Sequence, residues 1–216
     1  MNEVRTTETL TKAYRLIASL WCSPQDVEIG EVRQGALSLV SELREADGES
    51  AELLSRFLDQ PPITEEEYVE LFELSPQCAL YLGSHVFEEP KTCAEAANSD
   101  RSEYMVDLKN MYKHFGLEID KQELPDFLPI MVEFLGLTAQ SRHDAVRQKF
   151  IKEYMVPFMK PLCSRLDQLK TPYFDLGQAL SAIVQTDLVQ TDLVQTDLVQ
   201  TDLVQTDLTP TEDSGS

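Results

Sequence analysis

Hydrophobic residues recur every three or four positions along most of the chain, which is the spacing of one face of an α-helix. The first such stretch runs from about Thr7 to Trp21, and the second runs from Ile29 to Ala46. A third covers Ser50 to Leu58 and stops before two consecutive prolines. We expect these three segments to be helices that pack through their apolar faces.

Helix-start and helix-stop residues flank the later apolar segments. Thr64 and Glu67 have the spacing of a capping box, in which each side chain bonds the backbone N–H of the other residue. Gly116 stands where a left-handed residue commonly ends a helix. Further helices are therefore predicted over residues 65–75, 100–115, 125–135, 141–154, 157–169 and 172–183. About nine helices and no convincing strand indicate an all-α fold, a compact helical bundle.

The C-terminal part differs from the rest because it consists of five consecutive copies of VQTDL, over residues 184–208. A five-residue period gives neither a single apolar stripe on a helix nor an apolar face on a strand. We expect residues 1–184 to form the helical domain and residues 185–216 to be a disordered, acidic, low-complexity tail. Stacking of the repeats into a solenoid is the alternative.

The formal net charge of −20 limits the partners that the protein can bind. Such a surface repels phosphate, so we expect no binding to nucleic acid or to an anionic membrane surface. It favours either a basic partner segment or solubility alone. The N-terminal residues lack an apolar signal region and no run of 18 apolar residues occurs, so we expect a cytoplasmic protein without stable membrane insertion.

No motif for catalysis, metal binding or cofactor binding is visible. The four cysteines form no CxxC pair, and the three histidines have no metal-ligand spacing. Nucleotide-binding glycine motifs and a GxSxG sequence are also missing. We therefore expect no enzyme and no cofactor. A hydrolase that uses paired carboxylates is an alternative, but no spacing brings two acids together in a pocket. Glu73 and Glu133 stand out among the acids because each lies beside an aromatic residue on an apolar segment, and the other interpretation of each is a solvated or ion-paired side chain.

Two segments combine acids, aromatic residues and helix starts. One covers residues 67–73, with the sequence EYVELFE, and the other covers residues 123–135, with the sequence ELPDFLPIMVEFL. Core packing accounts for the leucines, but it explains Asp126 and its flanking prolines less well. A rigid acidic and aromatic helix entrance suits a peptide that carries Arg or Lys.

These segments carry a family resemblance that extends over about residues 8–183. Tyr68-x-x-Leu71-Phe72-Glu73 comes first, and an MYxxFGL sequence over residues 111–117 follows it. The most specific piece is ELPDxLP over residues 123–129, followed by Glu-Phe-Leu at residues 133–135. The chain resembles the TorD/DmsD/NarJ superfamily of redox-enzyme maturation chaperones, and is most similar to its NarJ-type branch. In that branch a histidine usually follows the aspartate, whereas this chain has Phe127 there.

The resemblance implies an all-α chaperone without catalytic activity. Its implied partner is the N-terminal segment of the apo catalytic subunit of a molybdenum oxidoreductase such as nitrate reductase. The chaperone would support insertion of the molybdenum cofactor before export or membrane attachment. Its implied state is a monomer, with a domain-swapped dimer as the alternative. The candidate client-peptide contacts are Tyr68, Leu71, Phe72, Tyr81, His85, Asp126 and Phe127.

A generic helical adaptor unrelated to molybdoenzymes is the competing interpretation. It would share the composition and the apolar stripes, and the ELPD sequence would then be a coincidence. An adaptor would present a binding groove whose lining omits Phe72 and Asp126.

Overall fold

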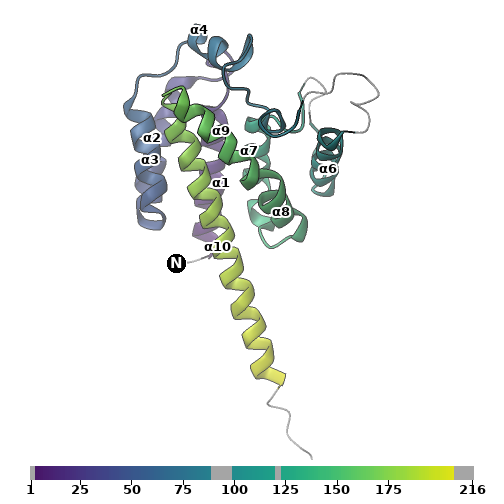
Figure 1. Ribbon diagram of the computed structural model, residues 1–216. Helices are drawn as coiled ribbons and strands as arrows, with labels where there is room; N and C mark the ends of the chain where they lie inside the picture. The colour runs from purple at the N-terminus through teal and green to yellow at the C-terminus, as the bar shows by residue number, and fades with distance from the viewer. Residues whose placement is uncertain (1–2, 89–98, 120–122, 207–216) are drawn as a thin grey trace, which may run out of the picture.

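The structure, a computed structural model, describes residues 3–88, 99–119 and 123–206, and all its regular elements are helical. Within these residues the one bridge between extended segments joins Tyr81 to Phe127. The prediction of an all-α fold is therefore confirmed (Figure 1). Over the same residues, no helix has both the length and the apolar character needed to cross a bilayer.

The first three helices begin and end close to the predicted positions. They are α1 (Glu3–Leu20), α2 (Ile29–Ala46) and α3 (Gly48–Asp59). Asp47 separates α2 from α3 and caps the second of these, because its side chain accepts the backbone N–H of Ser50 at 3.0 Å. The same short linker therefore ends one helix and starts the next.

The predicted capping box is confirmed at the start of α4 (Glu65–Tyr68). The Thr64 hydroxyl accepts the Glu67 N–H at 3.3 Å, and the Glu67 carboxylate accepts the Thr64 N–H at 2.9 Å. One wider, π-helical turn, η1 (Val69–Glu73), continues the helix. The chain then leaves the helical conformation, and Ser75 adopts a positive φ of 50° ahead of Pro76.

The middle of the chain holds a short 3₁₀ turn, η2 (Leu82–His85), and two longer helices. Helix α6 (Asp100–His114) is followed by Gly116 with a φ of 71°, as the sequence predicts. Helix α7 (Leu128–Leu137) starts three residues later than the predicted start near Pro125. Its first turn holds Pro129 instead, because the residues from Pro125 onward form the turn that leads into the helix.

The single helix predicted over residues 141–154 is wrong. Three short elements replace it: η3 (Ala139–Ser141), α8 (Ala145–Lys149) and the π-helical η4 (Phe150–Met155). Asp144 causes the break, because its side chain accepts the N–H groups of Val146 and Arg147 and so starts a new helix. Pro157 is predicted to cause a kink or a new helix start, and α9 (Val156–Gln168) begins there with proline in its first turn, directly after η4 and with no non-helical residue between them.

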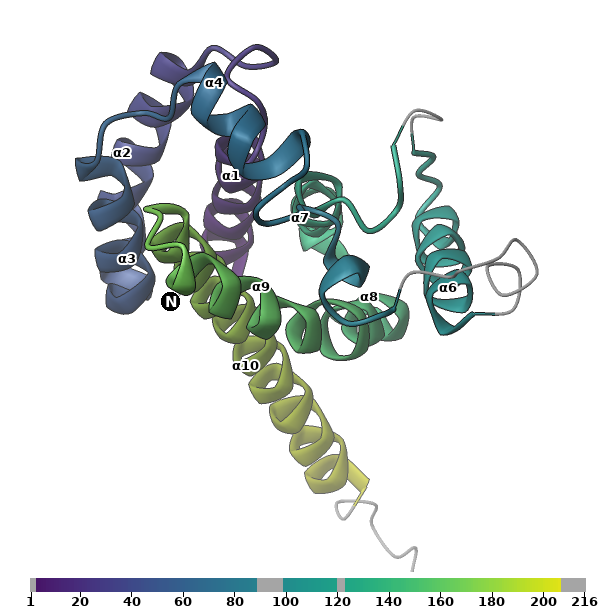
Figure 2. The same ribbon diagram turned by 45° about the horizontal axis from the view of Figure 1, so that its top comes forward.

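Helix α1 lies at the centre of the bundle and contacts α2, α7 and α10. Its inward face includes Ala13, Tyr14 and Ile17, and none of these side chains has any exposed surface. Helix α10 (Tyr173–Thr206) packs against α3 and α9. Figure 2 shows α9 and the first half of α10 side by side, with the remainder of α10 extending beyond the bundle.

The packed region extends past the predicted domain boundary at residue 184. Helix α10 continues through the repeats, and Val184 and Leu188 of the first copy are 1% and 8% exposed. Thr186 donates its hydroxyl to the Asp47 carboxylate at 2.7 Å. The expectation of disorder from residue 185 therefore does not apply to the first VQTDL copy, which belongs to the helical core.

Asp187, also in the first repeat, forms a fully buried ion pair with Arg147. One nitrogen of the guanidinium donates to the Asp187 carboxylate at 2.8 Å, and both side chains are 0% exposed. The Tyr14 hydroxyl donates to the same carboxylate oxygen at 2.9 Å. The Arg147 guanidinium also donates to the Thr138 hydroxyl at 3.1 Å and to the Leu135 carbonyl at 3.2 Å. This network joins α1, the C-terminal end of α7, α8 and α10.

We predict that Asp187→Ala lowers the free energy of unfolding by about 3–5 kcal/mol, because it leaves the Arg147 charge buried and unpaired. Urea unfolding followed by circular dichroism measures the change. Gln185→Ala is the matched control, because Gln185 lies in the same turn of α10 with an exposed side chain. Equal stability of these two variants would contradict the role of the ion pair.

Truncation tests the same feature without a substitution. A chain that ends at Ile183 loses Asp187 and should be destabilised at least as strongly as Asp187→Ala. A chain that ends at Leu193 keeps Asp187, Leu188 and Thr191 and should unfold close to the full-length protein.

Candidate functional site

Two short extended segments, one before η2 and one before α7, lie antiparallel to each other. The Leu82 N–H donates to the Asp126 carbonyl at 3.0 Å, and the Leu128 N–H donates to the Leu80 carbonyl at 2.9 Å. We call this pair of segments, residues 80–82 and 126–128, the clasp. It joins the segment around Tyr81 to the second acidic and aromatic region, residues 123–135, across more than forty residues of chain, whereas the first such region, residues 67–73, lies outside it.

The outer side of the clasp carries a pair of aromatic rings. The centroids of Tyr81 and Phe127 are 5.3 Å apart, and both residues are half-buried. The Tyr81 hydroxyl donates to the Glu123 carboxylate at 3.1 Å. Burial and the negative charge of Glu123 raise the pKa of Tyr81, so the hydroxyl keeps its proton. Leu124 is 46% exposed in the segment that leads to Phe127.

Asp126 lies on the inner side of the clasp and is 0% exposed. Its Oδ2 accepts the Gly83 N–H at 3.0 Å, while its Oδ1 has no partner among the described residues. A Cβ at position 83 would lie 2.8 Å from Oδ2, so this close approach requires glycine. Burial raises the pKa of Asp126 above its usual range. In this conformation Asp126 supports the clasp and cannot touch a ligand at the surface.

Tyr68 and Phe72 are also buried, at 2% and 4% exposure. The Tyr68 hydroxyl donates to the Trp21 carbonyl at 2.8 Å. The Phe72 ring packs edge-on against Trp21 and Tyr173, with centroids 6.2 Å and 4.9 Å away. These two predicted contacts therefore anchor η1 to α1 and α10, and they do not reach the surface.

Leu71 faces outward from η1 into a groove of about 290 Å³. Its lining is mostly apolar and also includes the exposed residues Glu67 and Glu70. The residues that line it are Phe57, Pro61, Pro62, Ile63, Glu67, Glu70, Leu71, Gln77, Thr171, Pro172 and Tyr173. Leu71 is thus the member of the Tyr-x-x-Leu-Phe motif that a partner can contact.

His85 is half-buried at the end of η2. Its Nε2 lies 2.7 Å from the Ala79 carbonyl, so the ring forms a hydrogen bond within its own loop. The imidazole therefore helps to shape the segment that carries Tyr81.

Three exposed acids, Asp26, Glu73 and Glu133, lie near the end of α1, where their charges act on Cys22 and Tyr68. Burial raises the pKa of the Cys22 thiol to about 11, and the carboxylates of Asp26 and Glu133 contribute to the shift. The charge of Glu73 also contributes to the raised pKa of Tyr81. The three acids come from separate segments, so no sequence spacing could have grouped them.

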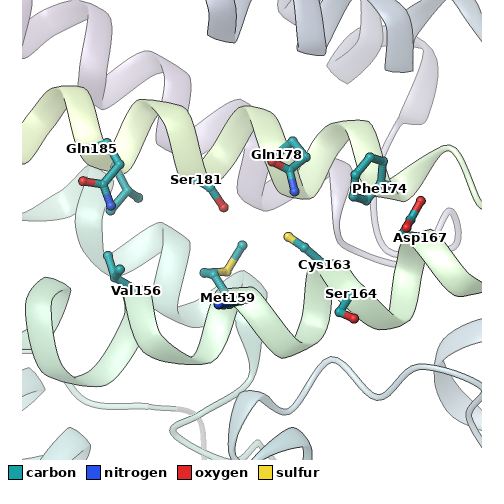
Figure 3. Close-up of a pocket in the computed structure, with 11 residues that line it drawn as sticks. Val156, Met159, Cys163, Ser164, Asp167, Phe174, Gln178, Ser181 and Gln185 are labelled. Carbon is teal, nitrogen blue, oxygen red and sulfur yellow. The ribbon is translucent and has the colours of Figure 1, made fainter.

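A second groove, of about 350 Å³, lies between α9 and α10 and includes none of the predicted site residues (Figure 3). Met159 and Cys163 lie at its floor, while Gln178 and Ser181 face them from α10. Burial raises the pKa of the Cys163 thiol to about 11, so the thiol stays protonated at neutral pH.

No group of three or more His, Cys, Asp or Glu side chains among the described residues is placed to hold a metal ion. Cys22, Cys78 and Cys163 carry free thiols. The fourth cysteine, Cys93, lies outside the described residues.

We predict that Asp126→Asn gains stability relative to the wild type as pH rises from about 4 to about 7. The Asp126 carboxyl has a raised pKa in the folded protein, so the folded state binds more protons than the unfolded state over this range. The contribution of Asp126 to wild-type stability therefore falls with rising pH, whereas asparagine does not titrate. Urea unfolding at a series of pH values measures the difference. A difference that is independent of pH would contradict the burial of this charge.

Comparisons with known proteins agree with the resemblance in the sequence. Residues 40–164 match the model of a family described as the nitrate reductase delta subunit. The chain is 28% identical over 168 residues to the probable nitrate reductase molybdenum cofactor assembly chaperone NarW of Escherichia coli K12, which covers 76% of this chain and 64% of that protein.

Two NarJ proteins are also similar. The nitrate reductase molybdenum cofactor assembly chaperone NarJ of Escherichia coli K12 is 29% identical over 166 residues, or 74% of this chain and 65% of that protein. The probable NarJ of Bacillus subtilis is 28% identical over 120 residues, or 56% of this chain and 58% of that protein. The matches thus span less than two thirds of the length of these relatives. Because the family model covers more than half of the 216 residues, the chain belongs to the nitrate reductase delta subunit family, within which it is similar to the NarJ-type chaperones.

Proposed function

We propose that this protein is an assembly chaperone that binds the apo catalytic subunit of a molybdenum oxidoreductase such as nitrate reductase. The observation that carries the proposal is the half-exposed Tyr81 and Phe127 pair beside the carboxylates of Glu123 and Glu73, in a chain of this family. The relatives are named as nitrate reductase molybdenum cofactor assembly chaperones. The protein would act by binding, without catalysis and without a cofactor of its own.

The chemistry of the clasp suits the N-terminal segment of such a subunit when that segment is an amphipathic helix carrying Arg or Lys. The rings of Tyr81 and Phe127 offer apolar surface to the helix, and aromatic side chains are common binding hot spots. Glu123 and Glu73 lie where they can pair with the cations of the peptide. The net charge of −20 would speed the approach of a basic segment.

The buried members of the predicted site have a supporting role in this proposal. Asp126 holds η2 through Gly83 and so fixes the position of the neighbouring Phe127. Tyr68 and Phe72 fix η1, which presents Leu71 to its groove. The direct contacts would be Tyr81, Phe127 and Leu71.

Phe127 changes the chemistry that the NarJ-type pattern would place here. An imidazole at this position could bond a polar group of the client and would titrate near neutral pH. The phenyl ring of Phe127 supplies apolar contact alone. We therefore propose that client binding at this position depends on apolar burial and on the neighbouring acids, and that it has no imidazole titration step.

The proposed sequence of events takes place in the cytoplasm. The chaperone holds the catalytic subunit until the molybdenum cofactor is inserted, and it delays export or membrane attachment until then. The named function of the relatives supports cofactor assembly as the purpose of binding. An adaptor without this role would bind the segment, but it would not change how much cofactor the subunit acquires.

We predict that Phe127→Ala weakens binding of a fluorescent peptide about tenfold or more, because it removes a half-buried aromatic contact. The peptide is the N-terminal segment of a nitrate reductase catalytic subunit, and fluorescence anisotropy measures its affinity. Leu37→Ala on α2 is the matched control, because Leu37 is apolar and 52% exposed far from the clasp in the sequence. Circular dichroism checks that both variants fold.

Equal affinities for wild type, Phe127→Ala and Leu37→Ala would overturn the clasp as the binding surface. Co-expression with the catalytic subunit tests the function itself. The wild type should raise the molybdenum content of the purified subunit, and Phe127→Ala should raise it less. A subunit that acquires the same molybdenum content with or without the protein would overturn the chaperone function.

A further inference from the structure

The groove between α9 and α10, called the valley below, runs between two antiparallel helices. The two helices are joined by a short turn, and their facing edges leave the valley open along about three turns of each helix (Figure 3). Its floor is apolar, and its rim is polar. The lining residues of α9 are Val156, Met159, Lys160, Cys163, Ser164 and Asp167, and those of α10 are Phe174, Gln178, Ser181, Val184 and Gln185.

The charged residues on the rim are arranged symmetrically along α9. Lys160 and Asp167 are both exposed, and neither makes an ion pair within the described residues. They are seven residues apart, which places them roughly 10 Å apart along the helix axis, too far to bond each other. Cys163 and Ser164 lie midway between them.

A second copy of the chain would satisfy both charges at once. If two α9 helices cross antiparallel about a two-fold axis at Cys163 and Ser164, Lys160 of each copy lies opposite Asp167 of the other. A two-fold contact uses the same surface on both copies, so it produces this ion pair twice.

The side chains at the midpoint permit a close approach of the helices. Ser164 and Ser181 are small, and the Cys163 thiol lies lower, at the floor of the valley. Each α9 could therefore enter the valley of the other copy, so that the four helices form a bundle.

We propose that the valley between α9 and α10 is a self-association surface, in which two copies of this chain pair through Lys160 and Asp167. The surface is separate from the clasp, so client binding and pairing of copies can occur together. The net charge of −20 on each copy opposes association at low ionic strength. Added salt screens this long-range repulsion, so pairing should strengthen between about 10 mM and 150 mM NaCl.

Charge exchange tests the pairing with the full-length chain. Sedimentation velocity over a range of protein concentrations should show a monomer–dimer equilibrium for the wild type. Lys160→Asp and Asp167→Lys should each weaken dimerisation about tenfold or more, because each places like charges opposite one another. The double variant restores opposite charges across the two-fold axis and should recover the wild-type dissociation constant.

Two controls separate this surface from general charge effects. Lys109→Asp changes the net charge by the same amount at an exposed position on α6, and it should leave dimerisation close to that of the wild type. Ser164→Trp places a bulky side chain at the crossing point and should abolish dimerisation without unfolding the chain. A wild type that stays monomeric throughout, or a double variant that dimerises no better than the single variants, would overturn the proposal.

Discussion

The buried ion pair between Arg147 and Asp187 is the interaction on which the arrangement of the bundle depends. An ionised side chain without a partner in the interior would be strongly destabilising, so neither residue can move away from the other. Their common network with Tyr14 and Thr138 fixes α1, α7, α8 and α10 relative to one another. Hydrophobic burial can tolerate small shifts of one helix against another, whereas this network has one geometry. The pair therefore specifies the packing, although it need not add to the net stability of the fold.

Much of the fold could be predicted from the sequence, because apolar periodicity and capping residues are local signals. The bounds of α2, the capping box at Thr64 and the left-handed Gly116 are all confirmed. The prediction failed where distant residues decide the outcome. The repeats have no apolar stripe, so their sequence predicts disorder. Asp187 is nevertheless buried because a cation on α8 requires it, and no local pattern shows that requirement.

The candidate site shows the same division between local and distant signals. The sequence named Tyr81 and Phe127 among the candidate contacts, and the structure brings their rings together in the clasp. It could not separate residues that contact a ligand from residues that hold those contacts in place. Asp126 and Phe127 are adjacent in sequence, yet the extended backbone points one inward and the other outward. In this motif one residue fixes the shape of the surface, and the next residue supplies the surface contact.

The position of Asp187 in the first VQTDL copy also bears on how the gene can change. The copies are identical, so loss of one whole copy from anywhere in the array regenerates the same sequence after Ile183. The packed residues, which extend from Val184 to Thr191, need only the first copy and the start of the next one. Any array that keeps the first copy and the start of the next therefore supplies the packed residues from Val184 to Thr191 unchanged.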